Sequence, residues 1–235
     1  VEMAYQEEPL AIIWCVRGDG QLIALTYQRE QEVVAWHRHI IGGSFGTGNA
    51  VCESVAVIPT EDSEYELYMI VKRTIGGATT RYVEYLNTFD FDQTNNTSFN
   101  YLDSQLGLSI SQTTLTAGIS ATVTTIPVAS VSGLSSSGKI KIGGEIISYT
   151  GISSLNLTGC TRGQNITSAK AHLSGAVVKE VINIIGGLNH LNGQTVSILA
   201  DGATHPDKVV SNNSITLDRF STDVKIGLGY TSILK

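Results

Sequence analysis

Short apolar runs that each end in a turn signal constrain this chain more than any other feature. The first of them read AIIWCVR, the turn GDG, QLIALTYQ, the polar turn REQE and then VVAWHRHII. Within the runs, apolar and polar residues alternate, and alternation places every second side chain on one face of a strand. No stretch has the i, i+3, i+4, i+7 spacing of an amphipathic helix. The chain is therefore predicted to be all-β, built from antiparallel hairpins.

The composition agrees with strands and tight turns, because the chain has 24 Gly, only 4 Pro and only 15% charged residues. The formal net charge is −6. A protein that grips nucleic acid through its phosphates is normally basic. We therefore expect no specific binding of nucleic acid, whereas DNA that passes without being gripped remains compatible with this charge.

The three cysteines, Cys15, Cys52 and Cys160, are widely spaced. They form neither a disulfide framework nor a CxxC zinc pair, which favours synthesis in a reducing compartment. No apolar stretch of about 18 residues is present, so no membrane span is predicted. The first residues lack the pattern of a signal peptide, and the chain starts mid-pattern without Met. We expect it to be a piece of a longer protein.

Changes in composition divide the chain into four predicted regions. Residues 1–90 repeat strand and turn about twice, which is typical of two blade-like antiparallel units of a β-propeller. The polar, irregular residues 91–113 are interpreted as a connector. Residues 114–181 have few charges and many Ser-Gly and Gly-Gly turns, which predicts an inserted small β-barrel or sandwich. Residues 182–235 are predicted to form a small β-domain that continues the host domain.

His37 and His39 are the first candidates for a functional site. On a strand, residues two apart share a face, and two such imidazoles make half of a zinc or nickel site. No third ligand is indicated by spacing. The favoured interpretation is structural: the histidines are polar contacts between blades or subunits, with Trp36 as a packing anchor. No cofactor is predicted.

Other motifs favour structure over chemistry. The glycine-rich stretch Gly42–Ala50 lacks the Lys-Ser/Thr of a phosphate loop and opens no helix, so it is predicted to be a loop. Cys160 has Arg162 and His172 near it in sequence, but a small buried side chain is the favoured interpretation. Neither a GxSxG motif nor a spaced carboxylate pair is present, so no enzyme activity is predicted.

Several of these stretches together resemble a known family. DGQLIALTYQREQEVVAWHRH, ESVAVIP and ELYMIVKRTIGGATTRYVEYL, followed later by GLNHLNGQTVSILADG and GLGYTSIL, are similar to bacteriophage tail nozzle proteins of the tail tubular protein B group. The middle stretch TTIPVASVSGLSSSGKIKIGGEIISYTGI resembles a small β-module of phage structural proteins. That module is often labelled after a half-domain of ubiquitin-activating enzymes, and its enzymatic chemistry is not expected here.

The resemblance implies a virion tail component, made in the cytoplasm of a bacterial host. It implies a propeller-like platform, in a ring of six, that joins adjacent tail proteins and conducts DNA without binding it specifically. It supplies no catalytic residues. The insertion is expected to project from the body, where it contacts another tail protein or the host surface.

Two alternatives stay open from the sequence. The first is a receptor- or carbohydrate-binding module, since small β-domains with exposed aromatic residues bind sugars, and Tyr149 and Tyr230 are the candidates. The second, least favoured, is a metal-dependent enzyme that uses His37 and His39.

Overall fold

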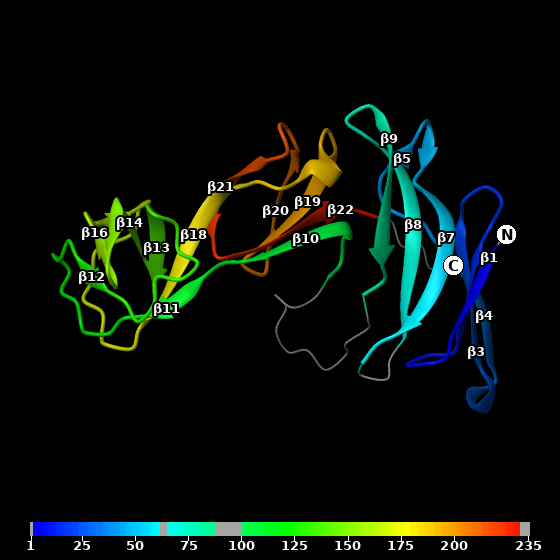
Figure 1. Ribbon diagram of the computed structural model, residues 1–235, viewed down its shortest axis with the longest axis horizontal. Helices are drawn as coiled ribbons and strands as arrows, with labels where there is room; N and C mark the ends of the chain where they lie inside the picture. Colours follow the sequence, from blue (N-terminus) through cyan, green and yellow to red (C-terminus); the bar gives the residue numbers. More distant parts are fainter. Residues whose placement is uncertain (1, 62–64, 88–99, 231–235) are drawn as a thin grey trace.

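The computed structural model describes residues 2–61, 65–87 and 100–230. Over these residues the chain is all-β, with two short 3-10 turns, which confirms the predicted fold class. Neither described helical turn is long and apolar enough to cross a membrane. Three β-units lie in a row along the long axis (Figure 1). We call them the N-terminal unit, the central unit and the inserted unit.

The N-terminal unit consists of two antiparallel sheets. The first has the order β1-β2-β3-β4 and the second β7-β8-β9, with a small β5-β6 hairpin inside the predicted glycine-rich loop. Their elements are β1 (Glu2–Gln6), β2 (Ile12–Val16), β3 (Leu22–Gln28), η1 (Arg29–Gln31), β4 (Val33–His39), β5 (Ser44–Phe45), β6 (Gly48–Asn49), β7 (Val51–Pro59), β8 (Tyr65–Ile75) and β9 (Ala78–Tyr85).

One core lies between these two sheets. Alternation along β2 and β3 turns Trp14, Leu22 and Ala24 inward, and alternation along β8 turns Leu67 and Val71 toward them. The two predicted blade-like units are therefore two sheets that share a single core. Their closure into a propeller stays a prediction.

The central unit is a four-stranded sheet, β10-β22-β19-β20, with β21 at its side. Its elements are β10 (Asp103–Ser109), η2 (Asn189–Leu191), β19 (Thr195–Ala200), β20 (Ala203–Val209), β21 (Ile215–Ser221) and β22 (Asp223–Leu228). Here the structure differs from the expected connector over 91–113, because β10 pairs with β22 and packs Leu106 and Leu108 on the core. Residues 91–99 and 231–235 lie outside the described residues.

The inserted unit has two sheets over a core that runs from Leu115 to Val178, inside the expected range 114–181. The larger sheet has the order β11-β18-β13-β14-β17, and the smaller one β12-β16-β15. Neither sheet closes into a barrel among the described residues. The elements are β11 (Gln112–Thr114), β12 (Ile126–Pro127), β13 (Gly138–Ile142), β14 (Glu145–Tyr149), β15 (Gly151–Ser153), β16 (Asn156–Thr158), β17 (Thr161–Gln164) and β18 (Val177–Ile185).

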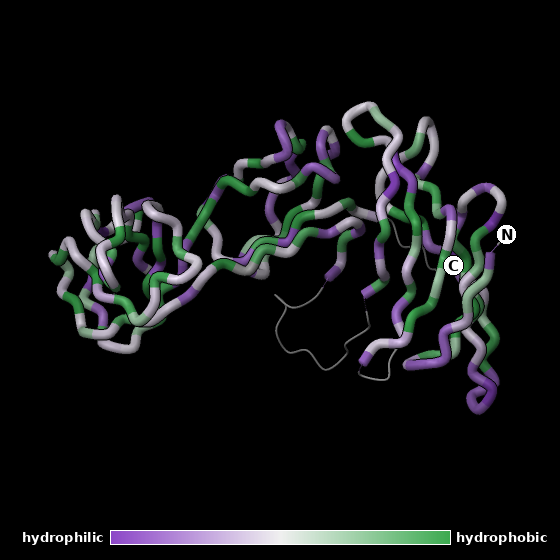
Figure 2. Tube along the Cα trace, in the orientation of Figure 1, coloured by the Kyte–Doolittle hydropathy of each residue, from purple (hydrophilic) through white to green (hydrophobic). Residues whose placement is uncertain are grey.

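Strand β18 belongs to both the inserted and the central unit. Its first half pairs with β13, from Val178 to Val181, and its second half pairs with β21, from Ile182 to Ile185. The chain enters the inserted unit after β10 and returns along β18 (Figure 1). Hydrophobic residues line the strands, and hydrophilic residues collect at the hairpin tips (Figure 2). The insertion is thus joined to its host by two neighbouring passages of chain.

Candidate functional site

The histidine pair lies on β4, where both rings point toward the core face of the first sheet. The Nδ1 atom of His37 is 2.8 Å from Nε2 of His39, and Nε2 of His37 is 2.9 Å from the Thr26 hydroxyl. The His39 ring centroid is 5.1 Å from that of Trp14. The two rings are therefore hydrogen-bonded to each other and packed on a buried indole.

The pair is neutral at pH 7. Burial lowers the pKa of His37, and burial together with the neighbouring His37 lowers the pKa of His39 to about 4. One of these two ring nitrogens donates a hydrogen bond to the other, so they do not both direct a lone pair at a common ion. Among residues 2–61, 65–87 and 100–230, no group of three or more His, Cys, Asp or Glu is arranged to hold a metal. The geometry supports a hydrogen-bonded pair rather than a metal site.

Trp36 is not the packing anchor that the sequence suggested. It is 64% exposed, on the outward face of β4, while Trp14 is 2% exposed in the core and donates a 2.9 Å hydrogen bond to Gln6 Oε1. Alternation predicts which residues share a face but leaves open which face is inward. Here the face with the histidines is the inner one.

The two tyrosines proposed for sugar binding differ in exposure. Tyr149 is 2% exposed, and its hydroxyl donates a 2.8 Å hydrogen bond to the carbonyl of Ser135. It cannot stack on a sugar, so this candidate is wrong. Tyr230 is 49% exposed, at the end of the described residues. The structure does not bring the two side chains into one site.

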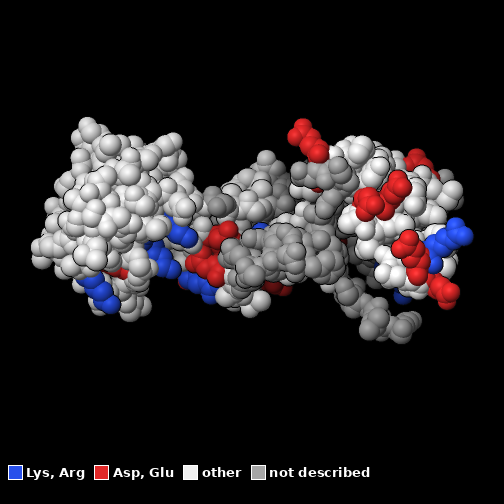
Figure 3. Space-filling model, turned by 90° about the horizontal axis from the view of Figure 1, so that it is seen from below, with Lys and Arg blue, Asp and Glu red and all other residues white. Residues whose placement is uncertain are grey.

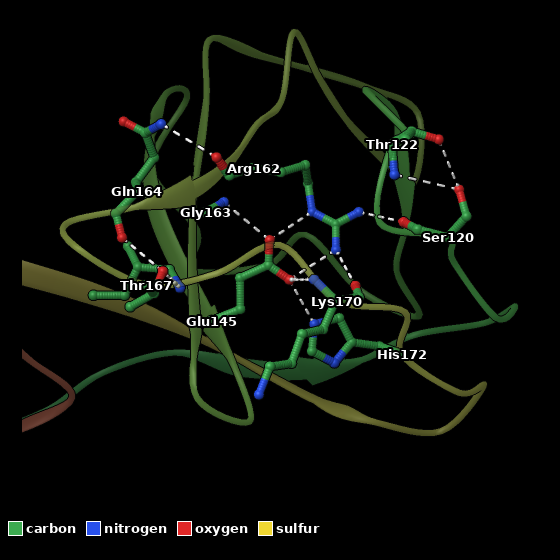
Figure 4. A network of polar contacts seen from close by, with 10 residues as sticks. Ser120, Thr122, Glu145, Arg162, Gly163, Gln164, Thr167, Lys170 and His172 are labelled. Carbon is green, nitrogen blue, oxygen red and sulfur yellow. Dashed lines mark hydrogen bonds and ion pairs between the residues drawn. The ribbon is translucent and has the colours of Figure 1, made fainter.

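A buried network that the sequence analysis missed lies in the inserted unit (Figure 4). Glu145, the first residue of β14, accepts two hydrogen bonds of 2.8 Å from the guanidinium of Arg162 on β17. It also contacts Nε2 of His172 at 2.8 Å and accepts hydrogen bonds from the backbone amides of Gly163 and Lys170. The Glu145 side chain is fully buried.

The donors keep Glu145 ionised. Burial alone would raise its pKa, but the hydrogen bonds from Arg162, His172, Lys170 and Gly163 lower the pKa to about 2. A carboxylate held this strongly is a poor proton donor or acceptor near neutral pH. The network is therefore suited to holding structure and unsuited to acid–base catalysis.

The network fastens the loops of the inserted unit. Arg162 also donates to the carbonyls of Ser120 and Lys170, so one guanidinium joins β17 to two separate loops. His172, which the sequence placed near Cys160, is engaged by Glu145 instead. Cys160 is buried, and burial raises the pKa of its thiol. The one feature of the sequence that could have indicated this network is Glu145, because it is one of only two acidic residues between positions 114 and 181.

A second buried polar cluster fixes the N-terminal unit to the central unit. The fully buried Arg73 forms an ion pair with Glu84 and donates a 2.8 Å hydrogen bond to the carbonyl of Gly42. The amide of Gly42 donates to Asp103 at 2.6 Å, and burial raises the pKa of Asp103. Gly43 has φ of +90°, and a Cβ there would lie 3.0 Å from Arg73. We call these residues the polar junction.

No family model matches the chain, and no curated protein is detectably similar to it in sequence. The histidine pair, the Glu145 network and the polar junction are therefore interpreted from their own geometry. All three hold parts of the chain together, and none presents an open cluster of reactive groups.

Proposed function

We propose that the protein is a structural component of a bacteriophage virion tail, in the nozzle or hub that conducts DNA during ejection. The observation that carries the proposal is the construction of the chain. Three units, each with its own core, are joined end to end by the polar junction on one side and by the shared strand β18 on the other. Such connections keep the surfaces of the three units at fixed distances from one another, as a subunit of a large assembly requires.

The finer features of this proposal come from the sequence resemblance. The chain is proposed to form a ring of six, to touch adjacent tail proteins, and to let DNA pass without specific binding. The acidic net charge of −6 supports the last point, because negative walls repel phosphate. The inserted unit extends away from the N-terminal unit (Figure 1), where it can meet a neighbouring protein or the host surface.

We assign no reaction to the protein. The buried Tyr149 weakens the carbohydrate-binding alternative, and the mutual hydrogen bond of His37 and His39 weakens the metal-dependent enzyme. A structural role requires neither site.

The proposal is tested on purified phage particles that carry the gene. Mass spectrometry is expected to find the protein in gradient-purified particles in a few to a dozen copies, and antibody labelling is expected to place it at the tail. Recovery of the protein only in the soluble lysate, with none in the particles, would overturn the proposal.

A further inference from the structure

Charge is divided unequally along this chain. Residues 114–181 contain five Lys and Arg against two Glu, a formal charge of +3. Residues 1–87 contain six Lys and Arg against twelve Asp and Glu, a formal charge of −6. These regions occupy opposite ends of the long axis, with the central unit between them (Figure 1). The molecule is therefore basic at one end and acidic at the other.

Burial sharpens this division at the basic end. Both acidic residues of the inserted unit, Glu145 and Glu180, are buried, and Arg162 neutralises the first. The remaining charges, Lys139, Lys141, Lys170 and Lys179, are exposed or partly exposed. The surface of the inserted unit thus displays ammonium groups and no exposed carboxylate.

Three of these lysines share the outward face of the larger sheet, and we call Lys139, Lys141 and Lys179 the lysine face. Lys141 on β13 is directly opposite Lys179 on β18, a like-charge pair that destabilises a sheet. Neither side chain forms an ion pair with any described residue. Val177, 49% exposed, extends the same face. Figure 3 shows basic side chains on this unit, several of them near its border with the central unit, where acidic side chains lie beside them.

The N-terminal unit has an acidic surface that is the counterpart of the lysine face. Exposed glutamates lie in three loops at one end of the N-terminal sheets, and we call them the glutamate end: Glu7, Glu8, Glu30, Glu32 and Glu61. The loops are neighbours, because the amide of Tyr65 donates a 3.3 Å hydrogen bond to the carbonyl of Glu8, and that of Tyr27 donates to Ala11. The β3-β4 tip is strongly hydrophilic (Figure 2). Arg29 is the one basic side chain among these loop residues.

We propose that the lysine face of one copy docks on the glutamate end of a second copy. The lysine face belongs to the inserted unit and the glutamate end to the N-terminal unit, with the central unit between them, so the two surfaces do not contact each other within one chain. Contact between copies relieves the repulsion between Lys141 and Lys179 and covers the open sheet face around Val177. Such a head-to-tail contact builds a ring when the rotation between copies closes, and a filament when it does not. The inference deepens the proposed function by naming the contact between neighbouring subunits.

The first test is sedimentation velocity of the purified chain at about 0.02 M and about 0.5 M salt, because charge pairs at a surface weaken as the screening length falls. Association is expected at low salt and dissociation at high salt. The double variant Lys141→Glu/Lys179→Glu is expected to raise the dissociation constant at least tenfold. Arg38→Glu/Lys170→Glu, which changes the net charge equally at exposed positions outside the lysine face, is the matched control and is expected to associate like the parent.

Mixing separates head-to-tail contact from other modes. Glu30→Lys/Glu32→Lys is also expected to prevent self-association. Mixed in equal amounts with Lys141→Glu/Lys179→Glu, it still offers an intact lysine face to an intact glutamate end, so a 1:1 complex is expected. Circular dichroism is used to check that each variant is folded.

Three results would overturn the proposal: a monomeric parent at both salt concentrations, unchanged association of the lysine variant, or no complex on mixing. Binding of duplex DNA to the lysine face by a chain that does not self-associate would assign that face to a polyanion and overturn it as well. The particle experiment tests the virion role separately. The contact between copies can therefore be disproved while the virion role is supported. The virion role can likewise be disproved while the contact is supported.

Discussion

The histidine pair of the N-terminal unit and the Glu145 network of the inserted unit contrast in where their residues lie. His37 and His39 are two residues apart and stand out in the sequence, yet they bond mainly to each other. Glu145, Arg162 and His172 are spread over 27 residues of ordinary-looking chain, yet they converge in the interior. The histidine pair is thus easy to recognise in the sequence, although it connects fewer residues than the Glu145 network does. The larger one depends on strand pairing that a single strand does not reveal.

The two constructions also differ in charge. The histidine pair is partly buried as neutral rings, whereas the glutamate is fully buried as an ion that its hydrogen-bond donors compensate. They should therefore respond differently to loss of a partner and to acid, and the following predictions use that difference.

The largest effect is expected from Glu145→Ala. The substitution leaves the buried guanidinium of Arg162 without its carboxylate, which typically costs about 3–5 kcal/mol of stability. Urea unfolding followed by circular dichroism measures the loss. Glu30→Gln on exposed η1 is the control and should stay within about 0.5 kcal/mol of the parent. A loss below about 1 kcal/mol for Glu145→Ala would contradict the proposed role of the network.

Acid should weaken the two ends of the molecule in different pH ranges. The folded pKa of His39, about 4, lies below its ordinary 6.5, so the unfolded state binds more protons between these values. The stability that neutral His39 contributes to the folded state is fully present above pH 6.5. It is lost as the pH falls toward 4, by up to about 3 kcal/mol. The contribution of Glu145, with a pKa of about 2 against 4.5, is full above pH 4.5 and is lost below it.

Hydrogen exchange measured by mass spectrometry at pH 7 and pH 5, corrected for intrinsic exchange rates, checks this difference. Peptides that cover β4 should lose protection at pH 5, while those that cover β14 should keep it. Equal loss in both would show that the histidine pair is not the acid-sensitive element.

A smaller effect is expected from His39→Gln. At pH 7 it exchanges one hydrogen bond for another and should cost about 1 kcal/mol. It should also remove most of the extra loss of β4 protection at pH 5. His37→Gln is the matched comparison, and it should leave more of the acid response because its partner His39 has the larger pKa shift.

The smallest effect is expected from Trp36→Ser, within about 0.5 kcal/mol, because that side chain is already exposed. Trp14→Ala is the matched comparison in the core and should cost about 3–5 kcal/mol. Thermal unfolding of the two variants decides between them. A large loss for Trp36→Ser would restore it as a packing residue.

The sequence predicted the fold class because alternation with period two is a local property. Strand β10 was missed, since its Leu106 and Leu108 are set among polar residues and its partner β22 is more than a hundred residues away. Likewise, alternation grouped Trp36 with Val34 correctly but did not reveal which face was inward. The Glu145 network could not be read from spacing, because its geometry follows from the pairing of β14 with β17.

The pairing of β10 with β22 has a consequence for folding during synthesis. Asp103 pairs with Leu228, so β10 lacks its partner among the described strands of its sheet until β22 leaves the ribosome. The inserted unit, whose contacts are more local, can form earlier, and loops of high sequence separation close slowly. The ordered start of β18 can then serve as the edge on which β21 assembles. We therefore expect the inserted unit to fold before the central sheet is completed.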